Sequence, residues 1–145
     1  MFKHILLPID GSELSLRAAK VGIELAQTCG ARVYALHVVP AFQAINYISE
    51  AAAASEPAYT EQAMGLATEY LAQVQRLAEE AGVKYSGGYD IAERAHEIIL
   101  QTASEKHCDL VVMASHGRRG LSRLLLGSET QKVLLQVDVP VLVCR

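Results

Sequence analysis

The chain has 145 residues, of which 51% are hydrophobic and 20% charged, and its formal net charge is −3. A chain of this length buries roughly 70% of its unfolded surface, so it needs neither disulfides nor a metal to fold. The slight negative charge argues against bulk nucleic-acid binding, which usually requires a basic face, and no apolar run approaches the ~20 residues of a membrane span.

The N-terminus and the cysteines indicate a cytoplasmic protein with one domain, residues 1–145. The opening stretch, "MFKHILLPIDGSE", lacks the length and the cleavage site of a signal peptide. The three cysteines, Cys29, Cys108 and Cys144, form no C-x-x-C pair. An odd and scattered set of this kind is typical of buried thiols in a reducing compartment.

Strand and helix signals alternate through the first half of the chain. His4–Ile9 is a short apolar run without alternation, which predicts a strand covered on both faces. A helix ending near Gly30 and a strand over Arg32–Val39 follow it. The apolar positions that predict this helix are Leu14, Ala18, Val21 and Leu25. Residues Ala41–Tyr59 show no clear apolar face, so we expect a variable loop or a partly helical excursion there.

The same alternation continues in the second half. An amphipathic helix is predicted to end at Gly82, and its apolar positions are Met64, Ala67, Leu71, Val74 and Ala78. The next helix is marked by Ile91, Ala95, Ile98, Ile99 and Thr102. The remaining predicted elements are strands over Val83–Tyr89, Asp109–Ala114 and Val139–Arg145 and a helix over Ser128–Gln136. Ser128 and Gln131 have the S-x-x-Q spacing of a capping box for that helix.

This order of elements predicts an α/β fold, a single doubly wound five-stranded parallel sheet with helices on both faces, of Rossmann-like type. Such sheets bind ligands beyond the carboxyl ends of the strands, where the winding reverses. The predicted walls of that crevice are the end of the first strand, Pro8–Asp10, and the end of the fourth, Met113–Ser115.

The segment "MASHGRRGLSRLLLGSET", residues Met113–Thr130, begins at one of these walls. Gly117 and Gly120 can expose backbone N–H groups in a turn, and Gly127-Ser128 opens a helix whose first N–H groups attract anions. Three arginines add positive charge: Arg118, Arg119 and Arg123. The segment can therefore form a phosphate cradle, although it lacks the G-K-[ST] of a Walker A loop. The residue types fit a capped surface loop with solvated arginines equally well.

The spacing Ala114-x₂-Gly117-x₉-Gly127-Ser128 resembles the G-x₂-G-x₉-G-[ST] motif of the ATP-binding universal stress proteins. "KHILLPIDGSE", "ALHVV", "DLVVMASHGRRGLSRLLLGS" and "VPVLVCR" also match that family's pattern in order, and only Ala41–Tyr59 matches weakly. The resemblance implies a five-stranded doubly wound sheet, a homodimer and a bound ATP. Ala114 replaces the first glycine of the motif, and we expect a negative φ there, which alanine tolerates.

The resemblance also implies the residues of the site. Pro8–Asp10 would border the nucleotide, the backbone of Val38 would meet the adenine, and Gly127–Thr130 would hold phosphates. The full set of expected cofactor-binding residues is Pro8, Ile9, Asp10, Val38, Met113, Ala114, His116, Gly117, Arg118, Arg119, Gly120, Gly127, Ser128, Glu129 and Thr130. Asp10 has two roles that the sequence leaves open: capping the helix that starts at Gly11-Ser12, or approaching Mg²⁺ through water. His116 either shapes the loop or touches phosphate.

Other patterns have simpler interpretations. "SGGYDI", Ser86–Ile91, is similar to the S-G-G-x-D-S loop of ATP pyrophosphatases, but it follows the third strand and ends in isoleucine, so we expect a turn. The histidines have no metal-ligand spacing, and His4 and His37 are predicted core or edge residues. A phospho-acceptor receiver domain would use Asp10, Asp90 and Ser115, but Gly11 stands where a second acid is required and no lysine follows the last strand.

Three functions remain open from the sequence. The first is an ATP-binding universal stress protein that acts as a nucleotide-dependent sensor or regulator. The second is a slow ATPase, although His116, Glu129 and Asp10 show no orienting partner in the sequence. The third is a structural dimer without nucleotide. The uncharged stretch Val139–Cys144 predicts pairing with a second copy, and the alternative is a monomer whose edge is covered by Ala41–Tyr59.

Overall fold

The structure is a computed structural model that describes residues 1–43, 55–118 and 125–145. Strands and helices alternate along the described residues, as the sequence predicts. Their bounds are β1 His4–Ile9, α1 Glu13–Cys29, β2 Arg32–Pro40, α3 Glu56–Glu80, β3 Tyr85–Ala92, α4 Ala95–Glu105, β4 Leu110–Ala114, α5 Ser128–Gln136 and β5 Val141–Cys144.

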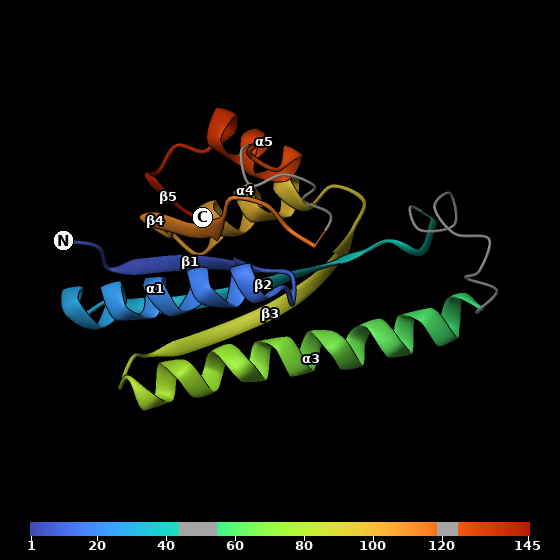
Figure 1. The fold of residues 1–145 in the computed structure, drawn as a ribbon, viewed down its shortest axis with the longest axis horizontal. Coiled ribbons are helices and arrows are strands. Elements are labelled where there is room, and N and C mark those ends of the chain that lie inside the picture. The colour runs from blue at the N-terminus through green and yellow to red at the C-terminus, as the bar shows by residue number, and fades with distance from the viewer. Residues whose placement is uncertain (44–54, 119–124) are drawn as a thin grey trace.

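The strands form one parallel sheet in the order β3-β2-β1-β4-β5. The chain therefore builds the sheet outward from β1 in one direction, then crosses back and continues with β4 and β5 on the other side. Helices α1 and α3 cover one face, and α4 and α5 cover the opposite face (Figure 1). The predicted doubly wound fold is confirmed, and the winding reverses between β1 and β4.

The core lies on both faces of β1. Ile5, Leu7 and Ile9 pack into the cluster under α1 and α3, while Leu6 packs into the cluster under α4 and α5. Because side chains alternate along a strand, an uninterrupted apolar run is what a strand covered on both faces requires. The central strand is therefore fixed in register by burial from both sides.

Helix α1 has the predicted ends, and its buried face matches the prediction in part. Ser12 is its N-cap, and Gly30 ends it with a φ of +67°. Of the predicted positions, Ala18 is buried, Leu25 is partly buried and Val21 is 40% exposed, and the buried positions also include Gly22 and Ala26. A Cβ added to Gly22 would overlap the Leu7 side chain, so small residues bring this helix close to the sheet. The prediction is wrong at Val21, which is exposed, while the larger residues Leu14 and Leu25 are only partly buried.

The third strand and the helix before it differ from the prediction. Helix α3 already starts at Glu56, with Pro57 in the first turn where proline is tolerated, and the part of the predicted excursion at 44–54 lies outside the described residues. Strand β3 includes Ser86–Ile91, so the predicted turn is wrong, and Ile91 belongs to this strand, not to α4. The glycines accommodate tyrosines: a Cβ on Gly88 would lie 2.8 Å from the Tyr34 hydroxyl.

The structure tests two further expectations, that the cysteines are buried thiols and that no segment spans a membrane. All three cysteines are free thiols, but only Cys108 is buried, and burial raises its pKa to about 11. Cys29 and Cys144 are half-buried, so the prediction of three buried thiols is wrong in part. Among the described residues, no helix has both the length and the apolar character needed to cross a membrane.

Candidate functional site

The crevice predicted from the winding lies where β1 and β4 end side by side. Ile5 and Leu6 of β1 pair with Leu110 and Val111 of β4, so both strands end at the same edge of the sheet. Beyond β4, the Ser115 N–H donates to the Cys144 carbonyl of β5 at 2.7 Å. The segments that follow β1 and β4 therefore leave the sheet on the two sides of the predicted crevice.

Asp10 joins these two walls. Its Oδ1 accepts the Ser12 N–H at 2.9 Å, and its Oδ2 accepts the Arg118 N–H at 3.0 Å. A Cβ on Gly117 would lie 2.5 Å from Oδ2, so a glycine at that position lets the loop approach the carboxylate. Burial alone would raise the pKa of Asp10, but the hydrogen bonds that it accepts outweigh burial and lower its pKa. The carboxylate therefore ties the loop after β4 to the end of β1.

The cap of α1 is a different residue from Asp10. Ser12 is the N-cap, and its side chain accepts the Ser15 N–H at 3.2 Å. The Ser15 hydroxyl in turn donates to the Ser12 carbonyl at 2.9 Å. Of the two roles left open for Asp10, capping the helix is therefore wrong: Asp10 bonds to the N-cap residue itself and stiffens the turn that precedes the helix.

A stack of side chains lies over the turn that follows β1. The Arg118 guanidinium carbon lies 5.2 Å from the centre of the Tyr70 ring, and Nη2 donates to the Tyr70 hydroxyl and to the Gly11 carbonyl. Tyr70 comes from α3 and meets His37 edge-on, with ring centres 5.3 Å apart. The His37 Nδ1 bonds to the Ile9 carbonyl at 2.9 Å, which confirms its predicted place in the core.

The start of α5 is attached to the end of β4 and forms the part of the second wall that we call the α5 wall. The Gly127 N–H donates to the Ser115 carbonyl at 2.7 Å, and a Cβ on Gly127 would lie 3.1 Å from the His116 Cα. The Thr130 hydroxyl, almost fully buried, donates to the Ala114 carbonyl at 3.0 Å. These contacts attach the helix start to the end of β4. The N–H groups of its first turn have no partners within the helix, as in any α-helix.

The predicted capping box at α5 is wrong. The N-cap is Gly127, whose φ and ψ are −59° and 150°, and no side chain caps the helix. Ser128 is the first helical residue and is exposed, and the Gln131 side chain donates to the Leu126 carbonyl at 2.7 Å. The hydroxyl of Ser128 makes no hydrogen bond within the described part of the chain. It is therefore available to a ligand.

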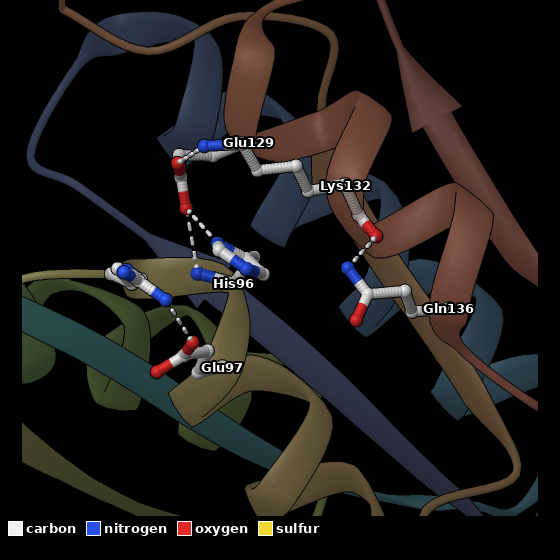
Figure 2. A network of polar contacts seen from close by, with 6 residues as sticks. His96, Glu97, Glu129, Lys132 and Gln136 are labelled. Atoms are coloured by element: carbon white, nitrogen blue, oxygen red, sulfur yellow. Dashed lines mark hydrogen bonds and ion pairs between the residues drawn. The ribbon is translucent and has the colours of Figure 1, made fainter.

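The Glu129 side chain points away from the crevice, toward α4. Its Oε2 accepts the backbone N–H of His96 at 2.7 Å and contacts the His96 Nδ1 at 2.9 Å (Figure 2). Lys132 donates to Oε1 at 3.1 Å. Burial would raise the pKa of Glu129, but these hydrogen bonds outweigh it and lower the pKa. The carboxylate ties the starts of α4 and α5 together, and only the backbone N–H of Glu129 is left for a ligand.

The carbonyl of Val38 faces the β1 side of β2. The Arg32 N–H bonds to Lys3 on the β1 side, whereas the Val33 N–H bonds to Lys84 on the β3 side. Since successive residues of a strand direct their backbone groups to alternate neighbours, Val38 faces the β1 side, as Arg32 does. The last pair between β1 and β2 is Ile9 with His37, so the Val38 carbonyl lies beyond the ladder.

The other residues that were predicted to bind the cofactor differ in how exposed their side chains are. Gly117 and Arg118 are exposed, and Pro8 and His116 are half-buried, with the His116 Nδ1 3.1 Å from the Ser115 hydroxyl. Three side chains are buried in the protein and leave only their backbones for a ligand: Ile9, Met113 and Ala114. Ala114 has no positive φ, which confirms that alanine fits this position. The predictions for Arg119, Gly120 and Arg123 lie outside the described residues.

Tyr70 is the site residue that sequence reasoning missed. It lies 40 or more residues from either wall along the chain, and a tyrosine at this place in an amphipathic helix carries no signal of its own. The glycine at position 11 is the one indirect sign, because its φ of +80° and the Tyr70 ring against it both require glycine. Among the described residues, no group of three or more His, Cys, Asp or Glu side chains could hold a metal ion.

Comparison with known sequences shows which family this chain resembles. The sequence model of the universal stress protein family matches residues 1–145. The chain is 37% identical over 145 residues to the universal stress protein MJ0531 of Methanocaldococcus jannaschii, with 100% of this chain and 83% of that protein covered. It is 35% identical over 147 residues to a universal stress protein of Thermus aquaticus, with all of both chains covered.

Solved structures share the fold. The structure of protein MJ0577 matches with a TM-score of 0.83 and 28% identity, covering 99% of this chain and 96% of that chain. A universal stress protein in complex with cAMP matches with a TM-score of 0.74 and 17% identity, covering 99% and 97% of the two chains. One from Archaeoglobus fulgidus in complex with dAMP matches with a TM-score of 0.70 and 16% identity, covering 100% and 98%.

Proposed function

The chain belongs to the universal stress protein family, and we propose that it is an ATP-binding member that acts as a nucleotide-dependent sensor or regulatory partner. The observation that carries this proposal is the start of α5, which opens at the crevice between β1 and β4 with Gly127 and an exposed Ser128. Family neighbours in complex with cAMP and dAMP support an adenine nucleotide as the class of ligand.

The residues of the crevice fit a nucleotide with phosphates. The first-turn N–H groups of Ser128, Glu129 and Thr130 and the Ser128 hydroxyl are donors of the kind that binds phosphate at helix starts. The helix dipole adds to their attraction for an anion. On the other side of the crevice, the Val38 carbonyl can accept a hydrogen bond from an exocyclic amine such as that of adenine. ATP would therefore be bound mainly by backbone groups.

Magnesium would reach Asp10 only through water. Both Asp10 oxygens already accept backbone N–H groups, from Ser12 and Arg118. A carboxylate has about four lone-pair sites, so each oxygen can still accept a hydrogen bond from a water on Mg²⁺. We propose this indirect contact and no direct ligand.

Binding is favoured over catalysis. A hydrolase needs a group that positions or deprotonates the attacking water. Glu129, one of the three candidates, points to α4, and Asp10 is held by two backbone N–H groups. His116 is left, and within the described ranges its Nδ1 has one partner, the neighbouring Ser115 hydroxyl. The described residues thus offer binding groups and no arranged base, which fits a sensor better than an ATPase.

Ser128→Pro tests this proposal. Ser128 is the first helical residue, where proline is favoured, and the ψ of 150° at Gly127 suits a residue before proline. The substitution removes one N–H donor and one hydroxyl from the phosphate site without opposing the helix. We expect ATP affinity, measured by calorimetry, to fall at least about tenfold, because hydrogen bonds to charged groups contribute about 1.5–3 kcal/mol. Ser128→Ala, which removes only the hydroxyl, should reduce ATP affinity by a smaller factor.

Two results decide this test. The circular dichroism spectrum and the unfolding midpoint should match those of the parent chain, which shows that α5 is intact. Unchanged ATP affinity in a folded Ser128→Pro variant would contradict the phosphate site at α5.

We further propose a homodimer through β5. This strand lies at the edge of the sheet, Leu142 on it is 38% exposed, and Leu135 on the neighbouring α5 is 83% exposed. The described ends of the 41–59 stretch lie at β2, where the Tyr59 hydroxyl donates to the Pro40 carbonyl, so they do not cover β5. Pairing β5 with its own copy covers the edge and closes the assembly.

Leu142→Lys tests the dimer. A lysine there places like charges near the twofold axis, so sedimentation should show a dimer for the parent chain and a monomer for the variant. Leu66→Lys is the matched control, because Leu66 on α3 is 39% exposed and remote from β5. A parent chain that sediments as a monomer at micromolar concentration would overturn this part of the proposal. The three free thiols agree with the proposed cytoplasmic location.

A further inference from the structure

Tyr70 holds a charged side chain of the crevice in place, although it belongs to neither wall. The Arg118 guanidinium lies over the Tyr70 ring at 5.2 Å and donates to the Tyr70 hydroxyl. The same nitrogen, Nη2, donates to the Gly11 carbonyl at 3.3 Å. Arg118 thus starts on the β4 side, where its N–H bonds to Asp10, and its side chain reaches the β1 side.

Tyr70 is itself rigidly placed. Its ring lies against Gly11 so closely that a Cβ there would overlap it, and it meets His37 edge-on. His37 is buried and bonded to the Ile9 carbonyl at 2.9 Å. A half-buried tyrosine held on two sides is a fixed partner for a flexible arginine.

The contacts of Arg118 leave most of its donors for a ligand. A guanidinium carries five N–H donors, and both of the side-chain hydrogen bonds use Nη2. In the described part of the chain, no hydrogen bond uses Nη1 or Nε of Arg118. Those three remaining donors lie on an exposed side chain at the crevice.

We propose that Tyr70 is a positioning residue that holds Arg118 across the crevice so that its remaining donors bind the phosphates of the nucleotide. The inference rests on the proposed function, because it assigns a role within the same site. A guanidinium matches the geometry of phosphate oxygens and binds them through two N–H groups at once. An arginine already held in one conformation loses less rotamer freedom when the phosphate binds.

The test compares two ligands, ATP and adenosine, that differ only in the phosphates. Calorimetry on the full chain gives the affinity of each for the parent, Tyr70→Phe and Tyr70→Leu. Tyr70→Leu removes the ring and the hydroxyl, and we expect ATP affinity to fall about three- to tenfold while adenosine affinity stays within about twofold. Tyr70→Phe keeps the ring that packs on Gly11, so it should fold as the parent does. Its ATP affinity should fall by about half as many logarithmic units as that of Tyr70→Leu.

Two controls separate positioning from packing. Tyr85→Phe removes another hydroxyl that bonds to α3, at the Leu71 carbonyl, and it should change neither affinity. In an Arg118→Met background, Tyr70→Leu should have no further effect on ATP affinity, because its partner is already absent. A merely structural role of Tyr70 would persist in that background.

Each other outcome has a distinct meaning. Equal losses for ATP and adenosine would show that Tyr70 supports the nucleoside or the fold, and tighter ATP binding would show that it competes with phosphate for Arg118; both overturn the inference. Unchanged ATP affinity in both Tyr70 variants overturns it while leaving the proposed function intact. A parent chain that binds neither ligand overturns the proposed function as well.

Discussion

The two walls of the crevice are built from different groups. At the β1 wall, side chains hold one another: Asp10 binds the Arg118 backbone, and Arg118 binds Tyr70. At the α5 wall, the side chains of Glu129 and Thr130 are bonded away from the crevice, to α4 and to β4. What the α5 wall offers is backbone N–H groups and one hydroxyl. The first wall is a set of side chains from distant parts of the chain, and the second is a local property of a helix start.

This difference predicts that substitutions at the β1 wall affect stability more than equivalent ones at the α5 wall. Gly11→Ala should have the largest effect, because a φ of +80° disfavours alanine and its Cβ would overlap Tyr70. We expect the free energy of unfolding to fall by about 2–4 kcal/mol, from the left-handed backbone and the forced shift of the ring. Denaturant unfolding monitored by circular dichroism measures it.

Two matched variants sharpen this comparison. Gly127→Ala at the α5 wall brings a Cβ to 3.1 Å from the His116 Cα with no positive φ, so its cost should be about 1 kcal/mol. Gly65→Ala in α3 has no atom within 4 Å and should be neutral or stabilise by about 0.5–1 kcal/mol. If Gly11→Ala were as mild as Gly65→Ala, the close contact with Tyr70 would be disproved.

A smaller effect is expected from Asp10→Asn, and it depends on pH. The pKa of Asp10 is below its usual value of 3.8 in the folded chain, so its stabilisation is fully present above that value and is lost as the pH falls through the folded pKa. Asparagine keeps one acceptor oxygen but loses the charge and the second acceptor. The variant should therefore be about 1–2 kcal/mol less stable than the parent at pH 7. This difference should shrink steadily between pH 5 and pH 2, values that bracket the usual carboxyl range.

Glu129→Gln is the counterpart at the α5 wall. The pKa of Glu129 is also lowered, so the sign of the pH dependence is the same, but its side chain is 40% exposed. At pH 7 the free energy of unfolding of Glu129→Gln should be about 0.5–1 kcal/mol below that of the parent, a smaller decrease than for Asp10→Asn, because exposed ion pairs are weak. A difference for Asp10→Asn that stays constant down to pH 2 would show that its charge does not hold the loop.

The sequence predicts the α5 wall better than the β1 wall. The reason is how far apart in the sequence the contacting residues lie. The α5 wall follows from local signals: Gly127-Ser128 opens a helix whose bounds, Ser128–Gln136, were predicted without error. The strand order and the place of the crevice follow from the alternation of elements along the chain. The β1 wall depends on Tyr70, and nothing near Asp10 in the sequence indicates which residue of α3 lies over Gly11.

The local errors have a related cause. The glycines of "SGGYDI" suggested a turn, but they lie inside β3, because Tyr34 and Tyr85 fill the space that side chains would take. Ser128 suggested an N-cap, but the N-cap is Gly127 and Ser128 is the first helical residue. In both places the residue type has two common uses, and the sequence alone favours the commoner one. For the glycines, the tyrosine side chains explain the other use.

The central claim is that the backbone at the start of α5 binds the phosphates of ATP. The most direct measurement is an ATP titration followed by the backbone amide resonances of the isotope-labelled, nucleotide-free chain. We expect the largest shifts at Ser128, Glu129 and Thr130, smaller ones near Val38, and none at the far end of the sheet around Gly30 and Gly82. Adenosine should reproduce the shifts near Val38 and not those of α5. An ATP titration that leaves the three α5 amides unmoved would contradict the account.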